Sequence, residues 1–207
     1  MKLGEIKLQA LMLIFPDIAL EYREENTEEL IYNLRSSGAY GSYLSSSVGA
    51  INRAFSSIEQ KRLSGKACLA LNIKDGVRQG EYISFDLSPY SEILCVSEIY
   101  LEGISVDFNT VADSVISVKC NKQTGALQLV YYRRLTRINH TTSNNYEIAL
   151  GSIAEAIPYL VKADLLSGEN DSEATAARSI YEGMMEEYAS KNAEATCFQT
   201  VYSLGRI

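Results

Sequence analysis

The chain has 207 residues, of which 46% are hydrophobic and 22% are charged. This composition indicates a globular protein, and the length suits one domain or a core domain that carries an insertion. The formal net charge of −7 argues against a protein that holds nucleic acid by neutralising its phosphates, but it is compatible with one that surrounds DNA without gripping it.

The first 65 residues predict helices. Lys2–Phe15 is apolar on most of its circumference, which predicts a centrally packed helix that Pro16 ends. The acidic segment Asp17–Glu29 predicts a loop or an exposed helix start. A longer helical stretch follows, softened near Gly38 and Gly41. Its clearest apolar face consists of Leu44, Val48, Ile51, Phe55 and Ile58.

The periodicity changes from helix to strand at Lys66. Alternating or β-rich patterns predict five strands, at Ala67–Ile73, Glu81–Leu87, Ile93–Leu101, Val115–Cys120 and Ala126–Thr136. The last two predict a β-hairpin, because Asn121–Gly125 joins them and supplies a glycine for the left-handed position. The middle of the chain is therefore expected to be a β module inserted between helices.

Glu147–Ser190 predicts two antiparallel amphipathic helices joined by the short turn Ser167–Asn170. Gly168 suits the end of the first helix, and Asp171 or Ser172 can cap the second. The two apolar stripes are Ile153, Ala156, Ile157, Leu160 and Val161, then Ala174, Ala177, Tyr181, Met184 and Tyr188. Because the second stripe has the same spacing as the Leu44–Ile58 face, we expect those two helices to pack together.

The C-terminal segment Ala193–Ile207 carries only two charges, Glu194 and Arg206, and favours extended structure. It is expected either to add a strand to the protein's own sheet or to dock on a neighbour. The whole predicts an α+β fold: an antiparallel helical bundle with an inserted antiparallel β module and an extended C-terminal arm. The predicted boundaries are 1–65 for the first helices, 66–138 for the β module, 139–190 for the hairpin and 191–207 for the arm.

Residues that carry chemistry are sparse. The single histidine, His140, lies in a polar connector, and the four cysteines form no CxxC pair, so reduced thiols in a bacterial-type cytosol are expected. No nucleophile elbow, phosphate-binding loop or dinucleotide fingerprint is present. The sequence therefore predicts a non-enzymatic protein without catalytic residues, metal or cofactor, although abundant carboxylates leave a carboxylate-dependent hydrolase as a distant alternative.

One basic cluster lies at the end of the last predicted strand. Arg133 and Arg137 are expected on one face of that strand and Arg134 on the other. The charges could simply discourage sheet aggregation at an edge strand. Alternatively, they could contact an acidic partner subunit or a DNA phosphate.

Several local patterns resemble the head-to-tail connector, or adaptor, family of tailed bacteriophages. Val48–Phe55 is similar to the family's "IN.A" helix, and Tyr90–Gly103 is similar to its β insertion. Val130–Thr136 resembles the strand that leads into the late helices. Ile157–Leu165 with Ala176–Glu182 resembles the paired helices that read P-Y, aliphatic, acidic turn and A-x-x-Y-E. The order of these patterns carries the resemblance across most of the chain between Val48 and Ser190.

The resemblance implies a structural virion protein, made in the host bacterial cytoplasm and located in the neck. Copies would form a twelve-fold ring under the portal protein, pass double-stranded DNA without sequence-specific binding, and attach a downstream tail or stopper protein. Such a ring would serve genome packaging and ejection. The alternative within viral assembly is a tail-tube or tail-completion component that does not bind the portal.

The resemblance also assigns roles to residues. The C-terminal segment would dock on the portal, through Cys197, Phe198, Val201, Tyr202, Leu204 and Arg206. An acidic channel wall would keep DNA mobile, and its expected members are Glu169, Asp171 and Glu173, or alternatively the acidic cluster Glu21–Glu29.

Overall fold

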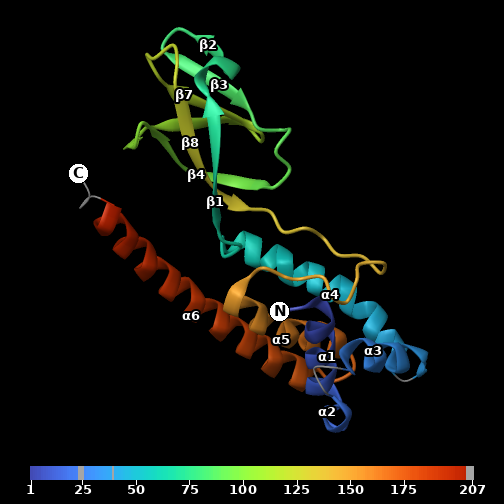
Figure 1. The fold of residues 1–207 in the computed structure, drawn as a ribbon. Coiled ribbons are helices and arrows are strands. Elements are labelled where there is room, and N and C mark those ends of the chain that lie inside the picture. The colour runs from blue at the N-terminus through green and yellow to red at the C-terminus, as the bar shows by residue number, and fades with distance from the viewer. Residues whose placement is uncertain (23–25, 39, 204–207) are drawn as a thin grey trace. The chain divides into compact units, whose positions relative to one another are not determined.

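The computed structural model describes residues 1–22, 26–38 and 40–203, with side chains described up to residue 191. It contains two compact units, a helical unit of Met1–Leu63 and Arg137–Ile207 and a β unit of Ser64–Thr136. Both are visible in Figure 1. The helical unit joins N-terminal to C-terminal helices, and the β unit holds two antiparallel four-stranded sheets, which confirms the α+β class.

The N-terminal part of the helical unit consists of α1 (Leu3–Ile14), α2 (Ile18–Glu21), α3 (Thr27–Ser36) and α4 (Gly41–Gln60). The predicted central position of the first helix is confirmed, because α1 packs against α2, α3, α4 and the later α5. Even Lys7 is buried there, and its Nζ donates a hydrogen bond to Asn144 Oδ1 at 3.0 Å. Burial lowers the pKa of Lys7, because a charged ammonium is poorly solvated at that position.

The C-terminal part consists of the 3₁₀ helix η3 (Gly151–Ala156), α5 (Ile157–Leu166) and α6 (Asp171–Ser203). The predicted helical hairpin is confirmed, since α5 packs closely against α6. All five residues of its first apolar stripe are buried. The α-helical part starts only at Ile157, where Pro158 occupies the first turn, a position that tolerates its missing N–H.

Three details of the hairpin differ from the prediction. Met185, not Met184, continues the buried stripe of α6 beyond Tyr181. Asn170, not Asp171 or Ser172, caps α6: its Oδ1 accepts the Glu173 N–H at 3.3 Å, and its Nδ2 donates to the Glu173 carboxylate at 2.9 Å. The apolar face of α4 packs chiefly on α5, which itself packs on α6. The expected contact between α4 and α6 is present but small, and it includes the ion pair of Lys61, at the end of α4, with Glu182 at 2.6 Å.

The β unit contains two sheets, ordered β1-β8-β4-β5 and β2-β3-β7-β6. Its elements are β1 (Lys66–Asn72), η2 (Ile73–Asp75), β2 (Val77–Gln79), β3 (Tyr82–Asp86), β4 (Ile93–Leu101), β5 (Ile104–Ser105), β6 (Phe108–Ala112), β7 (Val115–Lys119) and β8 (Ala126–Arg133). Buried residues from both sheets form one hydrophobic core, with Ile83, Ile99, Val118, Leu127 and Leu129 almost completely covered.

The predicted hairpin between the last two strands is wrong. β7 pairs with β3 and β6, whereas β8 pairs with β1 and β4, so the chain crosses between sheets after Cys120. Arg78 supports this crossing, because its guanidinium donates to the carbonyl oxygen of Cys120 at 2.8 Å and also to that of Lys122. The turn glycine, Gly125, thus precedes β8 without closing a hairpin.

The prediction that the C-terminal arm is extended is also wrong for the part of the arm that the structure describes, because Ala193–Ser203 continues α6 as a helix. The apolar residues Cys197, Phe198, Val201 and Tyr202 recur at steps of one, three and four, which a helix accommodates as readily as a strand. Leu204 and Arg206 lie outside the described residues. Within the described chain, no helix is both long and apolar enough to cross a membrane, α6 included.

Candidate functional site

An open cavity of about 530 Å³ lies on the helical unit, between α1, η3, α5 and α6. It is called the methionine groove here. Its lining residues are Met1, Gln9, Met12, Leu13, Glu155, Pro158, Tyr159 and Met184.

The lining of the methionine groove is mostly apolar and adaptable. Met12, Leu13, Tyr159 and Met184 are each only partly buried, so they form an apolar surface that remains open to solvent. Methionine side chains are flexible and polarisable, which suits contact with another macromolecule. Ile180, one helical turn before Met184, is 48% exposed and is a large apolar side chain on the same helix. These features together indicate a docking surface more than a small-molecule site.

The frame around this groove is fixed by polar contacts. Lys162 Nζ donates to the carbonyl oxygen of Leu13 at 2.8 Å and pairs with Glu173 at 2.9 Å, which links the end of α1 to α5 and α6. The Tyr188 hydroxyl donates to the carbonyl oxygen of Ser152 at 2.8 Å, which holds η3 against α6. A flexible lining within a fixed frame can accept a segment without rearranging the helices.

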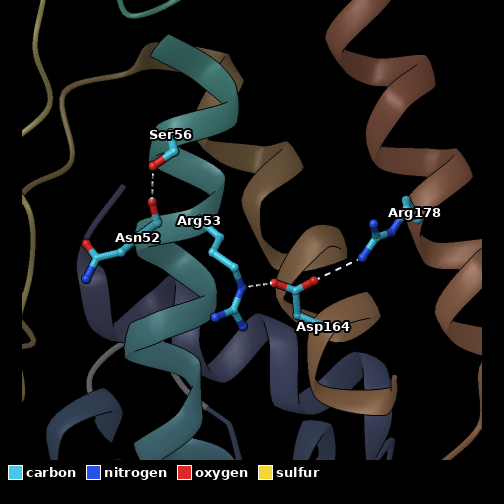
Figure 2. A network of polar contacts seen from close by, with 5 residues as sticks. All are labelled: Asn52, Arg53, Ser56, Asp164 and Arg178. Atoms are coloured by element: carbon cyan, nitrogen blue, oxygen red, sulfur yellow. Dashed lines mark hydrogen bonds and ion pairs between the residues drawn. The ribbon is translucent and has the colours of Figure 1, made fainter. Parts of the chain in front are cut away.

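A second polar feature joins three helices and is drawn in Figure 2. Arg53 of α4 donates through Nε to Asp164 Oδ2 at 2.6 Å, and Arg178 of α6 donates through Nη2 to Asp164 Oδ1 at 3.1 Å. The Asp164 side chain is 11% exposed, whereas the two arginine side chains are 62% and 57% exposed. One carboxylate of α5 therefore binds both neighbouring helices.

A different side of α4 holds the segment that returns from the β unit. Asn52 donates through Nδ2 to the carbonyl oxygen of Ile138 at 2.8 Å and accepts the Ile138 N–H at 3.0 Å. The Ser56 hydroxyl donates to the Asn52 carbonyl oxygen at 3.2 Å, as Figure 2 shows. Because Asn52 satisfies both backbone groups of a buried residue, it has a structural role.

Asp164→Ala is expected to lower the free energy of unfolding by about 1–2 kcal/mol, because it removes two ion pairs to half-exposed arginines, each worth about 1 kcal/mol or less. In that background, Arg178→Ala should have almost no further effect, since its partner is already gone. Urea unfolding of the single and double variants measures this coupling. The control is Glu187→Ala, which removes a solvent-screened i,i+4 pair with Lys191 on α6 and should leave the free energy of unfolding almost unchanged. Additive effects of Asp164→Ala and Arg178→Ala would contradict the network.

The three residues predicted for an acidic channel wall lie together, in the turn before α6 and in its first turn. Each has an intramolecular partner. Glu169 accepts the Tyr43 hydroxyl at 2.6 Å, a hydrogen bond that raises the pKa of Tyr43, and Asp171 Oδ1 accepts the Gly168 N–H at 2.9 Å. Glu173 pairs with Lys162. Negative charge at this end of α6 also favours the helix dipole, so these residues stabilise the turn, and their place in a channel wall stays a prediction.

The three arginines do not share a strand, because β8 ends at Arg133. The backbone N–H of Arg133 donates to Gly65 at 3.0 Å, and that of Arg134 donates to Glu92 at 2.7 Å. Arg137 belongs to the helical unit, where it pairs with Glu59 at 2.6 Å. The Glu59 side chain is only 8% exposed, so Arg137 neutralises a buried carboxylate of α4. A partner contact through Arg133 or Arg134 stays a prediction.

The described side chains show no arrangement of three or more His, Cys, Asp or Glu residues that could hold a metal ion. His140 is exposed in a turn. Cys68, Cys95 and Cys120 are free thiols, of which Cys120 is buried in the β core.

The methionine groove is the feature that sequence reasoning missed. One signal pointed to it: the first helix is apolar on most of its circumference, and Met12 and Leu13 near its end are only partly buried. The groove combines residues from three distant parts of the chain, so periodicity within one segment does not reveal it.

No protein-family model and no curated protein sequence matches this chain. The function is therefore inferred from the local sequence patterns and from the geometry described above.

Proposed function

We propose that this chain is a structural virion protein, the head-to-tail adaptor of a tailed bacteriophage. Copies assemble as a ring under the portal, continue its DNA channel and provide the attachment site for the tail. Two sequence patterns that resemble adaptor helices support the proposal. Val48–Phe55 lies in α4, and Ile157–Leu165 lies in α5. In the fold, the β unit also interrupts the helical unit, as the resemblance implies.

The length of α6 is the observation that carries the proposal. With 33 residues it is about 50 Å long at 1.5 Å per residue, whereas α5 has 10 residues and is about 15 Å long. Within the described chain, the elements that pack extensively on α6 are α5 and η3. A helix much longer than its intramolecular partners supports contact with another chain, as a ring or a neck requires.

In this proposal the two units have different roles. The helical unit packs laterally against neighbouring copies, and the β unit faces the next tail component or a neighbouring copy. The net charge of −7 keeps DNA from adhering to the ring, because like charges repel across the channel. Portal contact through the C-terminal part of α6 is part of the same proposal.

The copy number of this chain in purified virions tests the proposal. Quantitative mass spectrometry is expected to give a ratio to the portal protein near one, with major capsid protein as the internal standard. Deleting Ala193–Ile207 should abolish infectivity while filled heads still form, because the neck would be incomplete. Absence from virions, or a copy number far above that of portal, would contradict the adaptor function, and the latter would indicate a tail-tube component.

A further inference from the structure

The apolar lining of the methionine groove is only partly covered by the side chains that the structure describes. Met12, Leu13, Tyr159 and Met184 leave part of their apolar surface in contact with water, and the cavity remains open. Covering such a surface with aliphatic side chains is favourable, because apolar surface is removed from water. The occupant that fits is therefore a short aliphatic segment.

Glu155 adds a charge requirement to this groove. It is exposed at the rim, and within the described residues it forms neither a hydrogen bond nor an ion pair. An occupant that carries one cation beside its aliphatic side chains would complement both the lining and Glu155.

Leu204–Ile207 has this composition. It offers Leu204 and Ile207 as aliphatic side chains, Gly205 as a residue without a side chain, and Arg206 as a cation. Arg206 is also the first basic residue after Lys191, so the cation stands alone in an otherwise nearly uncharged stretch.

Chain geometry prevents this segment from reaching the groove of its own copy. Along α6, Ser203 lies about 28 Å beyond the lining residue Met184, at 1.5 Å per residue. Four extended residues span at most about 14 Å, so even a fully reversed chain from Ser203 stays well short of Met184. Any groove that the segment fills belongs to another copy.

We propose that the methionine groove binds Leu204–Ile207 of a second copy of this chain, with Arg206 paired to Glu155. The contact is head-to-tail: each copy offers its groove to one neighbour and its segment to another, and such heterologous contacts either close into a ring or continue as a filament. The inference rests on the proposed ring for closure, and it gives that ring a specific lateral contact.

Charge exchange tests the contact in the purified full-length chain, without portal. Glu155→Arg and Arg206→Glu each place like charges opposite one another, and each is expected to raise the concentration at half-assembly at least tenfold. The double variant restores opposite charges and should return to within about threefold of the wild type. Sedimentation velocity and native mass spectrometry measure assembly, and far-UV circular dichroism confirms that each variant is folded.

Glu29→Arg is the matched control, because it makes the same charge change at an exposed position of α3 outside the groove. It should assemble like the wild type. A synthetic peptide with the sequence of residues 198–207 should compete with wild-type assembly, and Glu155→Arg should not bind it. Unchanged assembly in both single variants, or a double variant that fails to recover, would overturn the proposal.

The proposed function and this inference fail in different ways. If the single variants assemble normally but lose binding to purified portal, then the segment docks on portal and the inference is wrong while the adaptor function stands. If charge exchange behaves as expected but the chain is absent from virions, then the contact between copies stands and the adaptor function is wrong.

Discussion

Tyr181→Ala is expected to lower the free energy of unfolding by about 3–5 kcal/mol, the usual range for truncating a large buried aromatic side chain. Tyr181 lies on α6 and is the largest side chain of the described residues that is completely buried. Alanine would leave a cavity where α6 meets the other helices, and a close-packed interior relaxes only partly around such a cavity. Urea unfolding followed by circular dichroism measures the loss.

Tyr181→Phe is the matched control, because it keeps the ring and removes only the hydroxyl. That hydroxyl is buried and directed at Ser57, but it lacks a hydrogen bond of ordinary geometry. Removing a poorly satisfied polar atom should change stability by less than about 1 kcal/mol, and towards greater stability. If phenylalanine were as destabilising as alanine, packing of the ring would not be the main contribution of Tyr181.

The same pair of proteins predicts a pH effect. Burial raises the pKa of Tyr181 in the folded state, whereas the unfolded chain titrates near the ordinary value of about 10. Above that pH the unfolded state loses its proton first, so stability present below about pH 10 is lost as the pH rises. The wild type should therefore lose more stability than Tyr181→Phe between neutral pH and pH 11. If the free energy of unfolding of the wild type and of Tyr181→Phe changed equally with pH, the Tyr181 phenol would not be buried in its neutral form.

Gly76→Ala is expected to destabilise the β unit by about 3 kcal/mol, at the upper end of the usual effect of overpacking. A Cβ at Gly76 would lie 2.3 Å from Ile83 Cγ2 and 2.9 Å from the Phe85 ring. Both neighbours are buried in the β core and cannot move into solvent. The φ of Gly76 is −86°, which any residue adopts, so the effect is steric and not conformational. Differential scanning calorimetry should show a lower melting temperature for the β unit.

Gly183→Ala provides the control for a glycine with free space around it. A Cβ there has no neighbour within 4 Å, and the position lies within α6. Alanine should stabilise the helix by about 0.5–1 kcal/mol, because it restricts the unfolded chain more than glycine does. A stabilising Gly76→Ala would show that the core around Ile83 is looser than the structure indicates.

The faces of the helices were predictable because their burial follows a local period. Val48, Ile51, Phe55 and Ile58 are buried as their spacing of three and four predicts. The choice of Met185 over Met184 was not predictable, because adjacent residues both fit a stripe that drifts around the helix. The partner of α4 was also uncertain, since an apolar face fits any other apolar face.

The pairing of strands was less predictable than the strands themselves. The Gly125 turn is a valid hairpin signal, but β8 forms longer ladders with β1 and β4, which lie far away in sequence. Non-local pairing outweighed the local turn. For the C-terminal segment, few charges and short apolar runs fit both helix and strand, and the helix of α6 simply continues to Ser203.

The candidate site was the least predictable part. The acidic residues Glu169, Asp171 and Glu173 stood out in the sequence, yet each has a partner within the chain. The methionine groove, by contrast, consists of ordinary core-type residues whose exposure depends on how α1, α5 and α6 meet. Sequence patterns identify residue types, whereas incomplete coverage of an apolar surface is a property of the assembled fold.

The pairing of β1 with β8 brings the two ends of the β unit together. Lys66 lies opposite Tyr132, and the Arg133 N–H donates to the Gly65 carbonyl oxygen at 3.0 Å. The chain therefore enters and leaves the β unit on two neighbouring, hydrogen-bonded strands. If the β unit were removed, a tight turn could join the two cut ends of the chain. The segment Ser64–Thr136 could therefore be exchanged for another closed module whose two ends lie equally close together. In the proposed adaptor, such an exchange would change the surface offered to the next component and keep the same helical core.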